Sequence, residues 1–160
     1  MNGLNHLPDS ARVWISQASA PLSDDHRTSI RAAIEPFIAQ WAAHGAALTA
    51  GFDILHDHFV VIAVDESQQA ATGCSIDKSV QVMLDLEQQL GLTFTDRKTI
   101  AYLQDNQITT APMHEFWALR KAGRVTADTL VFDNLVKTLG ELQDQWQKPF
   151  SESWHQTMWN

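Results

Sequence analysis

The longest strongly apolar run in this chain of 160 residues is Phe59-Val60-Val61-Ile62-Ala63-Val64. Successive side chains of a β-strand point to opposite faces, so a run without a polar residue is apolar on both faces. Such a run is typical of a central strand that is covered on both sides. It is too short to cross a membrane as a helix, which takes about 20 apolar residues.

The segment before this run predicts how the strand is paired. It alternates in polarity, as a half-buried strand does. Its apolar face consists of Leu48, Ala50, Phe52 and Ile54. Asp57-His58 is a turn sequence between this segment and the apolar run, so we expect the two to form a β-hairpin.

An amphipathic helix is predicted before the hairpin. Ser23 is a suitable N-cap, and Asp24 and Asp25 suit the first turn. The apolar face consists of Ile30, Ile34, Phe37, Ile38 and Trp41. Pro36 interrupts this pattern and predicts either a kink or two abutting helices, because proline lacks the amide hydrogen. Gly45 is the expected end of the helix.

A second helix is predicted after the hairpin. The loop 65–74 leads into it, with Ser75 as the expected N-cap and Gly91 as the end. Its apolar face consists of Ile76, Val80, Met83, Leu84 and Leu90.

Shorter elements are predicted in the rest of the chain. A strand at Val13-Trp14-Ile15 precedes the first helix. After the second helix we expect a hairpin, a helix, a strand, a helix and a tail that packs back on the body. Their ranges are 99–103 with 107–110, 114–122, 130–132, 135–146 and 149–160.

The predicted order is β-α-β-β-α-β followed by a helical third. This order indicates an α+β fold, a ferredoxin-like (split βαβ) two-layer sandwich with a helical C-terminal extension. We expect one domain over residues 1–160, with a flexible segment 1–11, a βαββαβ core 12–104, and a hairpin and helical extension 105–160. One sheet face is open in that fold, and we expect the C-terminal elements to cover it.

Charge and composition restrict the partners. The chain has 19 acidic and 11 basic residues and a formal net charge of −8. Nucleic acids and anionic lipid surfaces require clustered basic residues, so we expect neither as a partner. Cys74 is the single cysteine, which suits a reducing cytoplasm, and the first eight residues do not resemble a signal peptide. We therefore expect a soluble cytoplasmic protein.

Familiar catalytic motifs are missing. A P-loop requires a lysine directly after a glycine, and none of the lysines has one: Lys78, Lys98, Lys121, Lys137 and Lys148. The motifs G-x-G-x-x-G, G-x-S-x-G, H-E-x-x-H and C-x-x-C are also missing from the sequence. The chain is therefore not a P-loop ATPase, and we expect no cofactor and no metal.

The best candidate site is the junction between the apolar strand and the second helix. Carboxylates at the strand end would lie near the helix start, where backbone N–H groups favour anions and a thiol is more reactive. The candidate ligand-binding residues are Asp65, Glu66, Ser67, Gly73, Cys74, Ser75 and Asp77. The alternative is that Cys74 is a small buried hydrophobe and that the others are ordinary strand-end and capping residues.

Histidines and tryptophans give weaker candidates. His114 beside Glu115 could be an acid–base pair, although neighbouring residues on a helix face different directions and Phe116 explains the helix by packing. His56 and His58 could bind a metal, or lie at a solvated hairpin tip. Trp154 and Trp159 flank His155, and they line a pocket or a dimer interface or simply pack in the core. Of these residues, His114 joins the candidate ligand-binding set.

Several of these motifs together resemble a bacterial family. They are Val64-Asp65-Glu66-Ser67, Gly73-Cys74-Ser75-Ile76-Asp77, His114-Glu115-Phe116 and Ser153-Trp154-His155. The chain resembles, from about residue 12 to 155, a Bacteroidetes-type family whose members are often labelled "ABC transporter ATPase". The missing P-loop makes that label untenable for this chain. The resemblance implies a bacterial, cytoplasmic, stand-alone domain, and it carries over no catalytic residue.

Two functions follow from these observations. The first is a non-catalytic module that binds a ligand or a protein, including a homodimer that pairs sheet edges or apolar C-terminal faces. The second is a small-molecule enzyme that uses a polar pocket at Asp65, Glu66 and the Cys74-Ser75-Asp77 helix start.

Overall fold

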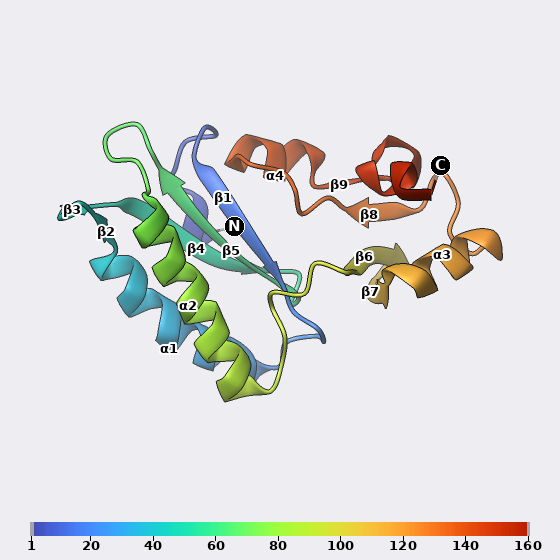
Figure 1. Ribbon diagram of the computed structural model, residues 1–160, viewed down its shortest axis with the longest axis horizontal. Helices are drawn as coiled ribbons and strands as arrows, with labels where there is room; N and C mark the ends of the chain where they lie inside the picture. The colour runs from blue at the N-terminus through green and yellow to red at the C-terminus, as the bar shows by residue number, and fades with distance from the viewer. Residues whose placement is uncertain (1, 160) are drawn as a thin grey trace.

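The structure is a computed structural model that describes residues 2–159, with the side chains of Asn2 and Trp159 outside the description. It has the expected α+β architecture, built from helices and small antiparallel sheets. Two larger sheets lie in different halves of the elongated molecule, as Figure 1 shows. Among residues 2–159, no helix combines the length and the hydropathy that a membrane crossing requires.

The apolar run forms the centre of the first sheet. Strand β5 (Phe59–Asp65) lies between β1 (Arg12–Gln17) and β4 (Thr49–Leu55) and is antiparallel to both. All residues from Phe59 to Val64 are buried. The prediction of a central strand covered on both faces is therefore confirmed. The β4–β5 hairpin turns at His56 and Asp57, which both have positive φ.

Two helices cover one face of this sheet. They are α1 (Asp24–Gln40) and α2 (Gly73–Leu90), which pack on the sheet through a shared apolar cluster. Ser23 caps α1 by accepting a hydrogen bond from the backbone of His26, as predicted. The helix runs as one element through Pro36, which is exposed, so the alternative of two abutting helices is wrong.

The first helix ends earlier than predicted. Its C-cap is Trp41, whose buried indole N–H donates to the carbonyl oxygen of Ser75 at 2.9 Å. The helix thus ends at the residue whose indole turns inward onto α2. Gly45 instead lies in the turn between two very short strands, β2 (Ala42–Ala43) and β3 (Ala46–Ala47).

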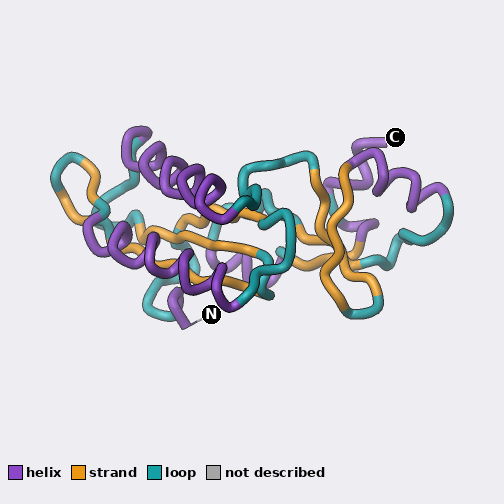
Figure 2. Tube along the Cα trace, turned by 90° about the horizontal axis from the view of Figure 1, so that it is seen from below, coloured by secondary structure: helices purple, strands orange, loops and turns teal. Residues whose placement is uncertain are grey.

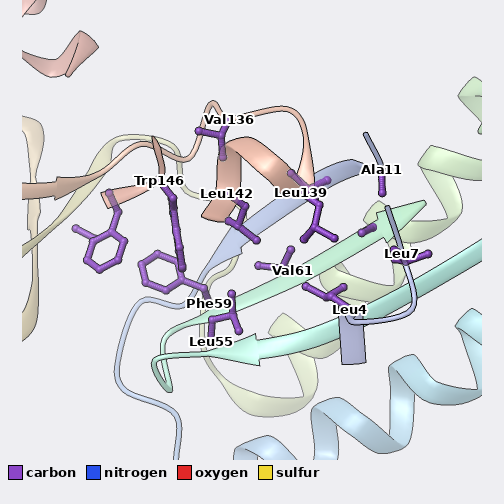
Figure 3. Packing of buried hydrophobic residues seen from close by; sticks show 14 residues of the cluster. Leu4, Leu7, Ala11, Leu55, Phe59, Val61, Val136, Leu139, Leu142 and Trp146 are labelled. Atoms are coloured by element: carbon purple, nitrogen blue, oxygen red, sulfur yellow. The ribbon is translucent and has the colours of Figure 1, made fainter. Parts of the chain in front are cut away.

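C-terminal elements cover the other face of the first sheet, as we expected from its apolar strand. Helix α4 (Leu139–Gln145) directs Leu139 and Leu142 at Val61 of β5 (Figure 3). Trp146, which follows α4, packs its ring edge against Phe59 at a centroid distance of 4.7 Å.

The N-terminal segment adds to the same core. We expected residues 1–11 to be flexible, but Leu4, Leu7 and Ala11 are buried in the described part of this segment. A 3-10 helix, η1 (Asn2–Leu4), opens the segment. The apolar residues of this segment cover the sheet beside α4. They are separated by polar residues, so the sequence shows no continuous apolar pattern there.

The second sheet has the order β7-β6-β8-β9. Its strands are β6 (Thr99–Gln104), β7 (Gln107–Pro112), β8 (Leu130–Phe132) and β9 (Gln147–Pro149). The remaining elements are α3 (Met113–Lys121), η2 (Phe150–Glu152) and η3 (Trp154–Trp159). The strand predicted at 130–132 is confirmed, and α3 begins and ends one residue before its predicted bounds.

One predicted helix is shorter than expected. The helix predicted over 135–146 begins only at Leu139, with Thr138 as its N-cap. Leu135, which we placed on its apolar face, is 60% exposed.

The fourth strand of the expected sandwich does not join the first sheet. The order β1-β5-β4 matches three strands of a split βαβ fold, in which β6 would lie next to β1. Strand β6 instead pairs along its length with β7 and at Tyr102 with β8. The ferredoxin-like arrangement is therefore not confirmed. Figure 2 shows the long connection that carries the chain from α2 into the second sheet.

Candidate functional site

The carboxylates at the end of β5 form hydrogen bonds with the backbone of the loop that follows. Asp65 Oδ1 accepts a hydrogen bond from the backbone N–H of Ser67 at 3.0 Å. Glu66 Oε2 accepts from the backbone N–H of Ala71 at 2.8 Å, which draws the loop back toward the start of α2. The strand end and the helix start therefore do lie at one end of the sheet. The two carboxylates, however, hold the loop closed.

The start of α2 is a capping box that lies earlier than predicted. Thr72 is the N-cap, and Ser75 is the third helical residue. The backbone N–H of Ser75 donates to Thr72 Oγ1 at 3.2 Å, and the backbone N–H of Thr72 donates to Ser75 Oγ at 2.7 Å. Ser75 is 2% exposed, so its hydroxyl serves the cap.

The remaining candidates of this junction face solvent. Gly73, Cys74 and Asp77 are exposed on the first turn of α2. The alternative that Cys74 is a small buried hydrophobe is therefore wrong. Its exposure makes the thiol accessible.

The histidine candidates are separated from this junction. His114 is exposed on α3, in the half of the molecule opposite the start of α2 (Figure 1). His56 and Asp57 at the hairpin tip are exposed, although the ring of His56 also packs against Trp146, so the tip is solvated as the alternative to a metal site proposed. Only His58, which is 3% exposed, is buried. Burial lowers the pKa of both histidines. Among residues 2–159, no group of three or more potential ligands could hold a metal ion.

A large cleft lies elsewhere, between the two main sheets. Its volume is about 1060 Å³, and residues of β1 and β6 line its two sides. Of the eight predicted site residues, all of them described, only Glu66 lines it. The cleft occupies the place beside β1 that the expected fourth strand would have filled.

The cleft runs along the edge of β1. Five consecutive residues, Val13 to Gln17, line it, although their side chains alternate between the two faces of the sheet. A space that touches both faces of a strand follows its edge. The backbone N–H of Val13 donates to the carbonyl oxygen of Lys137 at 3.0 Å, and that of Ser19 donates to Thr93 at 2.9 Å.

These two bonds show which backbone groups point outward. Alternate residues of an antiparallel strand direct their backbone groups to the same side, so Val13, Ile15 and Gln17 all face away from β5. Among the described residues, none bonds to the outward backbone groups of Ile15 or to the backbone N–H of Gln17. The middle of the β1 edge is therefore an unpaired sheet edge inside a cleft.

The walls of the cleft combine apolar and polar side chains. Helix α2 contributes Val80 and Met83, and Ile100 of β6 lies on the opposite side. Val80 is 45% exposed and Leu135 is 60% exposed, so two of the four exposed large hydrophobic residues among those described stand on this cleft. Trp154 also lines it, with a buried indole N–H that has no acceptor among the described residues.

The charged side chains that line the cleft differ in their hydrogen-bond and ion-pair partners. Arg12 lies 3.9 Å from Glu66, and Asp96 accepts hydrogen bonds from the backbone N–H of Lys98 and the hydroxyl of Thr99. Arg97 and Lys137 also line the cleft, and neither forms an ion pair with a described residue. Asp96 forms no ion pair with a described residue either, so the cleft has three cationic residues, Arg12, Arg97 and Lys137, against two carboxylates, Glu66 and Asp96, in a chain whose net charge is −8.

The tail closes one side of the cleft. His155 is 2% exposed, stacks on Trp154 at 4.0 Å and forms a hydrogen bond through Nδ1 with the hydroxyl of Ser153. Burial lowers the pKa of His155 to about 4, with Lys148 adding to the shift and Asp133 opposing it. The imidazole of His155 is therefore neutral. The tail packs back on the body, as we expected. The side chain of Trp159 lies outside the described residues.

Comparison with known proteins gives no assignment: no family model, no curated protein and no solved structure matches this chain. The functional argument therefore depends on the geometry of the cleft. Sequence reasoning missed it because Ile15 and Gln17 look like ordinary strand residues. Their outward backbone groups are unpaired because β6 pairs with β7 and β8 and not with β1.

Proposed function

We propose that this chain is a non-catalytic binding module that holds an amphipathic ligand in the cleft between β1 and β6. The observation that carries the proposal is a cleft of about 1060 Å³ that combines apolar wall residues such as Val80 and Met83 with backbone groups of Ile15 that have no partner among the described residues. Small-molecule and peptide sites have this composition, in which apolar surface supplies affinity and sparse polar groups supply orientation.

The enzyme hypothesis has less support. Asp65 and Glu66 are engaged in backbone hydrogen bonds, and Ser75 is engaged in the helix cap. A catalytic acid or base must reach a substrate, and these groups face their own loop. Cys74 is accessible but does not line the cleft.

Two finer expectations are part of the same proposal. We propose that the first half of the chain is a split βαβ unit whose fourth strand position is vacant, which the order β1-β5-β4 supports. The bacterial, cytoplasmic setting that the family resemblance implies also remains a proposal, and the mixed charge of this cleft suits a small module that acts in water.

A nuclear magnetic resonance (NMR) titration tests the binding function. A ¹⁵N-labelled sample would be titrated with a mixture of amphipathic carboxylic acids, amides and capped dipeptides. We expect the largest shifts at the indole N–H groups of Trp14 and Trp154 and at the amide of Ile15. Shifts that cluster instead at residues 65–77 would favour the enzyme hypothesis, and no shift at either place would contradict binding in the cleft.

A matched pair of variants locates the site. Leu135→Glu places a charge on the apolar rim of the cleft, whereas Leu130→Glu makes the same change at an exposed residue that does not line the cleft. We expect the first variant alone to weaken the binding of an amphipathic ligand. Equal effects of the two variants would mean that ligands bind elsewhere.

A further inference from the structure

The unpaired edge of β1 narrows the class of ligand, provided that the cleft is the binding site proposed above. We infer that the cleft takes a short, extended peptide with apolar and acidic residues, which pairs with Ile15 as an additional strand beside β1.

The backbone of β1 supplies the first argument. Ile15 presents an N–H and a carbonyl oxygen on the same outward side, and the N–H of Gln17 follows at the spacing of a strand. An extended peptide carries donors and acceptors at that same spacing, so it satisfies these groups together. A small molecule with one or two polar atoms cannot.

The length of the free edge supplies the second argument. The carbonyl oxygen of Lys137 occupies the outward N–H of Val13, and that of Thr93 occupies the N–H of Ser19. The unpaired stretch between them is short. A peptide therefore pairs over about four residues, which excludes the long strand of a second folded domain.

The side chains supply the third argument. An extended peptide directs alternate side chains to the two faces of the sheet. One face of the cleft offers Met83 and Val80 of α2, and the other offers Phe132 and Leu135. Apolar residues of the peptide therefore meet apolar surface on both faces.

Charge selects the residues that flank this apolar stretch. Arg97 and Lys137 line the cleft and form no ion pair with a described residue, whereas its carboxylates Glu66 and Asp96 accept backbone hydrogen bonds within the chain. Acidic residues at the ends of the peptide would pair with Arg97 and Lys137. The inferred ligand thus has an apolar centre and acidic ends.

The experiment uses capped pentapeptides of the form Asp-X-X-X-Asp, in which X is Val, Ile or Thr. Binding is followed by the amide shifts of the ¹⁵N-labelled full chain and by hydrogen exchange. We expect shifts at Ile15 and Gln17 and slower exchange of their amide hydrogens, because a pairing strand protects them. No protection at Ile15 on binding would overturn the inference.

N-methylated peptides provide the decisive control without any change to the protein. Methylation of alternate backbone nitrogens removes the donors of one edge of the peptide and leaves its charge and side chains intact. We expect one methylation register to weaken binding about tenfold or more, the effect of roughly one lost hydrogen bond, and the other register to bind nearly as well. Equal binding of both registers would overturn strand pairing.

Protein variants test the same contact from the other side. Ile15→Pro removes the outward N–H at an edge position, where proline is tolerated, and Ile15→Ala removes only the side chain. We expect the proline variant to lose peptide binding and the alanine variant to retain most of it. Loss of the cations in Arg97→Ala with Lys137→Ala should weaken binding, whereas Lys121→Ala on α3 should not.

The outcomes separate this inference from the proposed function. Amphipathic small molecules that shift the cleft signals while no peptide does so would overturn the peptide and leave the binding module standing. No ligand of either kind in the cleft would overturn both. A dimer in light scattering, with Ile15 protected before any peptide is added, would identify a second copy as the occupant and would also overturn the inference.

Discussion

The side-chain amide of Gln17 donates a hydrogen bond of 3.2 Å to the backbone carbonyl oxygen of Thr99, and so connects the edges of the two main sheets. The same side chain accepts a hydrogen bond from Asn134 at 2.9 Å, and Asn134 in turn accepts from the indole N–H of Trp146 at 2.9 Å. One polar chain thus extends from β6 across β1 to the helical cover of the first sheet. It holds the two walls of the cleft in place.

Loss of this connection should destabilise the protein. Gln17 is 8% exposed, so Gln17→Met keeps the bulk of the side chain but leaves Thr99 and Asn134 without their partner. We expect the free energy of unfolding to fall by about 1–3 kcal/mol, the usual effect of stranded polar groups. Urea denaturation would measure it, and Gln104→Met, at an exposed position of β6, is the control. Equal midpoints for the two variants would contradict this role.

The buried imidazole of His155 should make stability depend on pH. Its pKa is lowered to about 4 in the folded chain from an ordinary value of 6.5, so the unfolded chain binds more protons between these values. The contribution is full above pH 6.5 and is lost as pH falls toward 4. It amounts to about 3 kcal/mol, since each unit of pKa corresponds to about 1.4 kcal/mol.

Substitution of His155 tests that assignment. His155→Asn should flatten the pH dependence of the unfolding free energy between pH 6.5 and 4. Some slope should remain, because burial also lowers the pKa of His56 and His58. His114→Asn, at an exposed position, should leave the wild-type slope. An unchanged slope in the His155 variant would show that another group takes up the protons.

The apolar cover formed by α4 should be essential to the first sheet. Leu142 is 3% exposed in the cluster that packs against β5, so Leu142→Ala should cost about 2–5 kcal/mol of unfolding free energy. Leu135→Ala removes the same atoms from a side chain that is 60% exposed, and it should change stability by no more than about 0.5 kcal/mol. Similar thermal midpoints for both variants would mean that α4 contributes little to the core.

Cys74 should be modified without unfolding. It is exposed on the first turn of α2, so a maleimide should label the native protein to completion in the absence of denaturant. Mass spectrometry would measure the extent of labelling, and Cys74→Ser should take up none. The labelled protein should still bind ligands in the cleft, because Cys74 does not line it. Labelling that requires denaturant would show that the thiol is buried.

Local features were predictable wherever the chemistry is local. Ser23 caps α1 as its side chain predicts, and Gly91 ends α2 in the left-handed conformation that glycine favours. The cap of α2 was misplaced, because Thr72 and Ser75 form a reciprocal pair and either residue alone looks like an N-cap. The candidate site was predicted in part for the same reason. The strand end and the helix start do lie close together, but the hydrogen-bond partners of their polar groups depend on the conformation of the loop.

By itself the sequence determined the two long helices, the main strands and the central position of β5, because side-chain periodicity and capping act over a few residues. It also contains no lysine directly after a glycine, which the P-loop motif requires. Only the tertiary structure decided that β6 pairs with β7 and β8 and leaves β1 with an unpaired edge. Backbone hydrogen bonds between strands are the same for every residue type, so the choice of neighbour depends on long-range packing, and the open groups of Ile15 are a consequence of that choice.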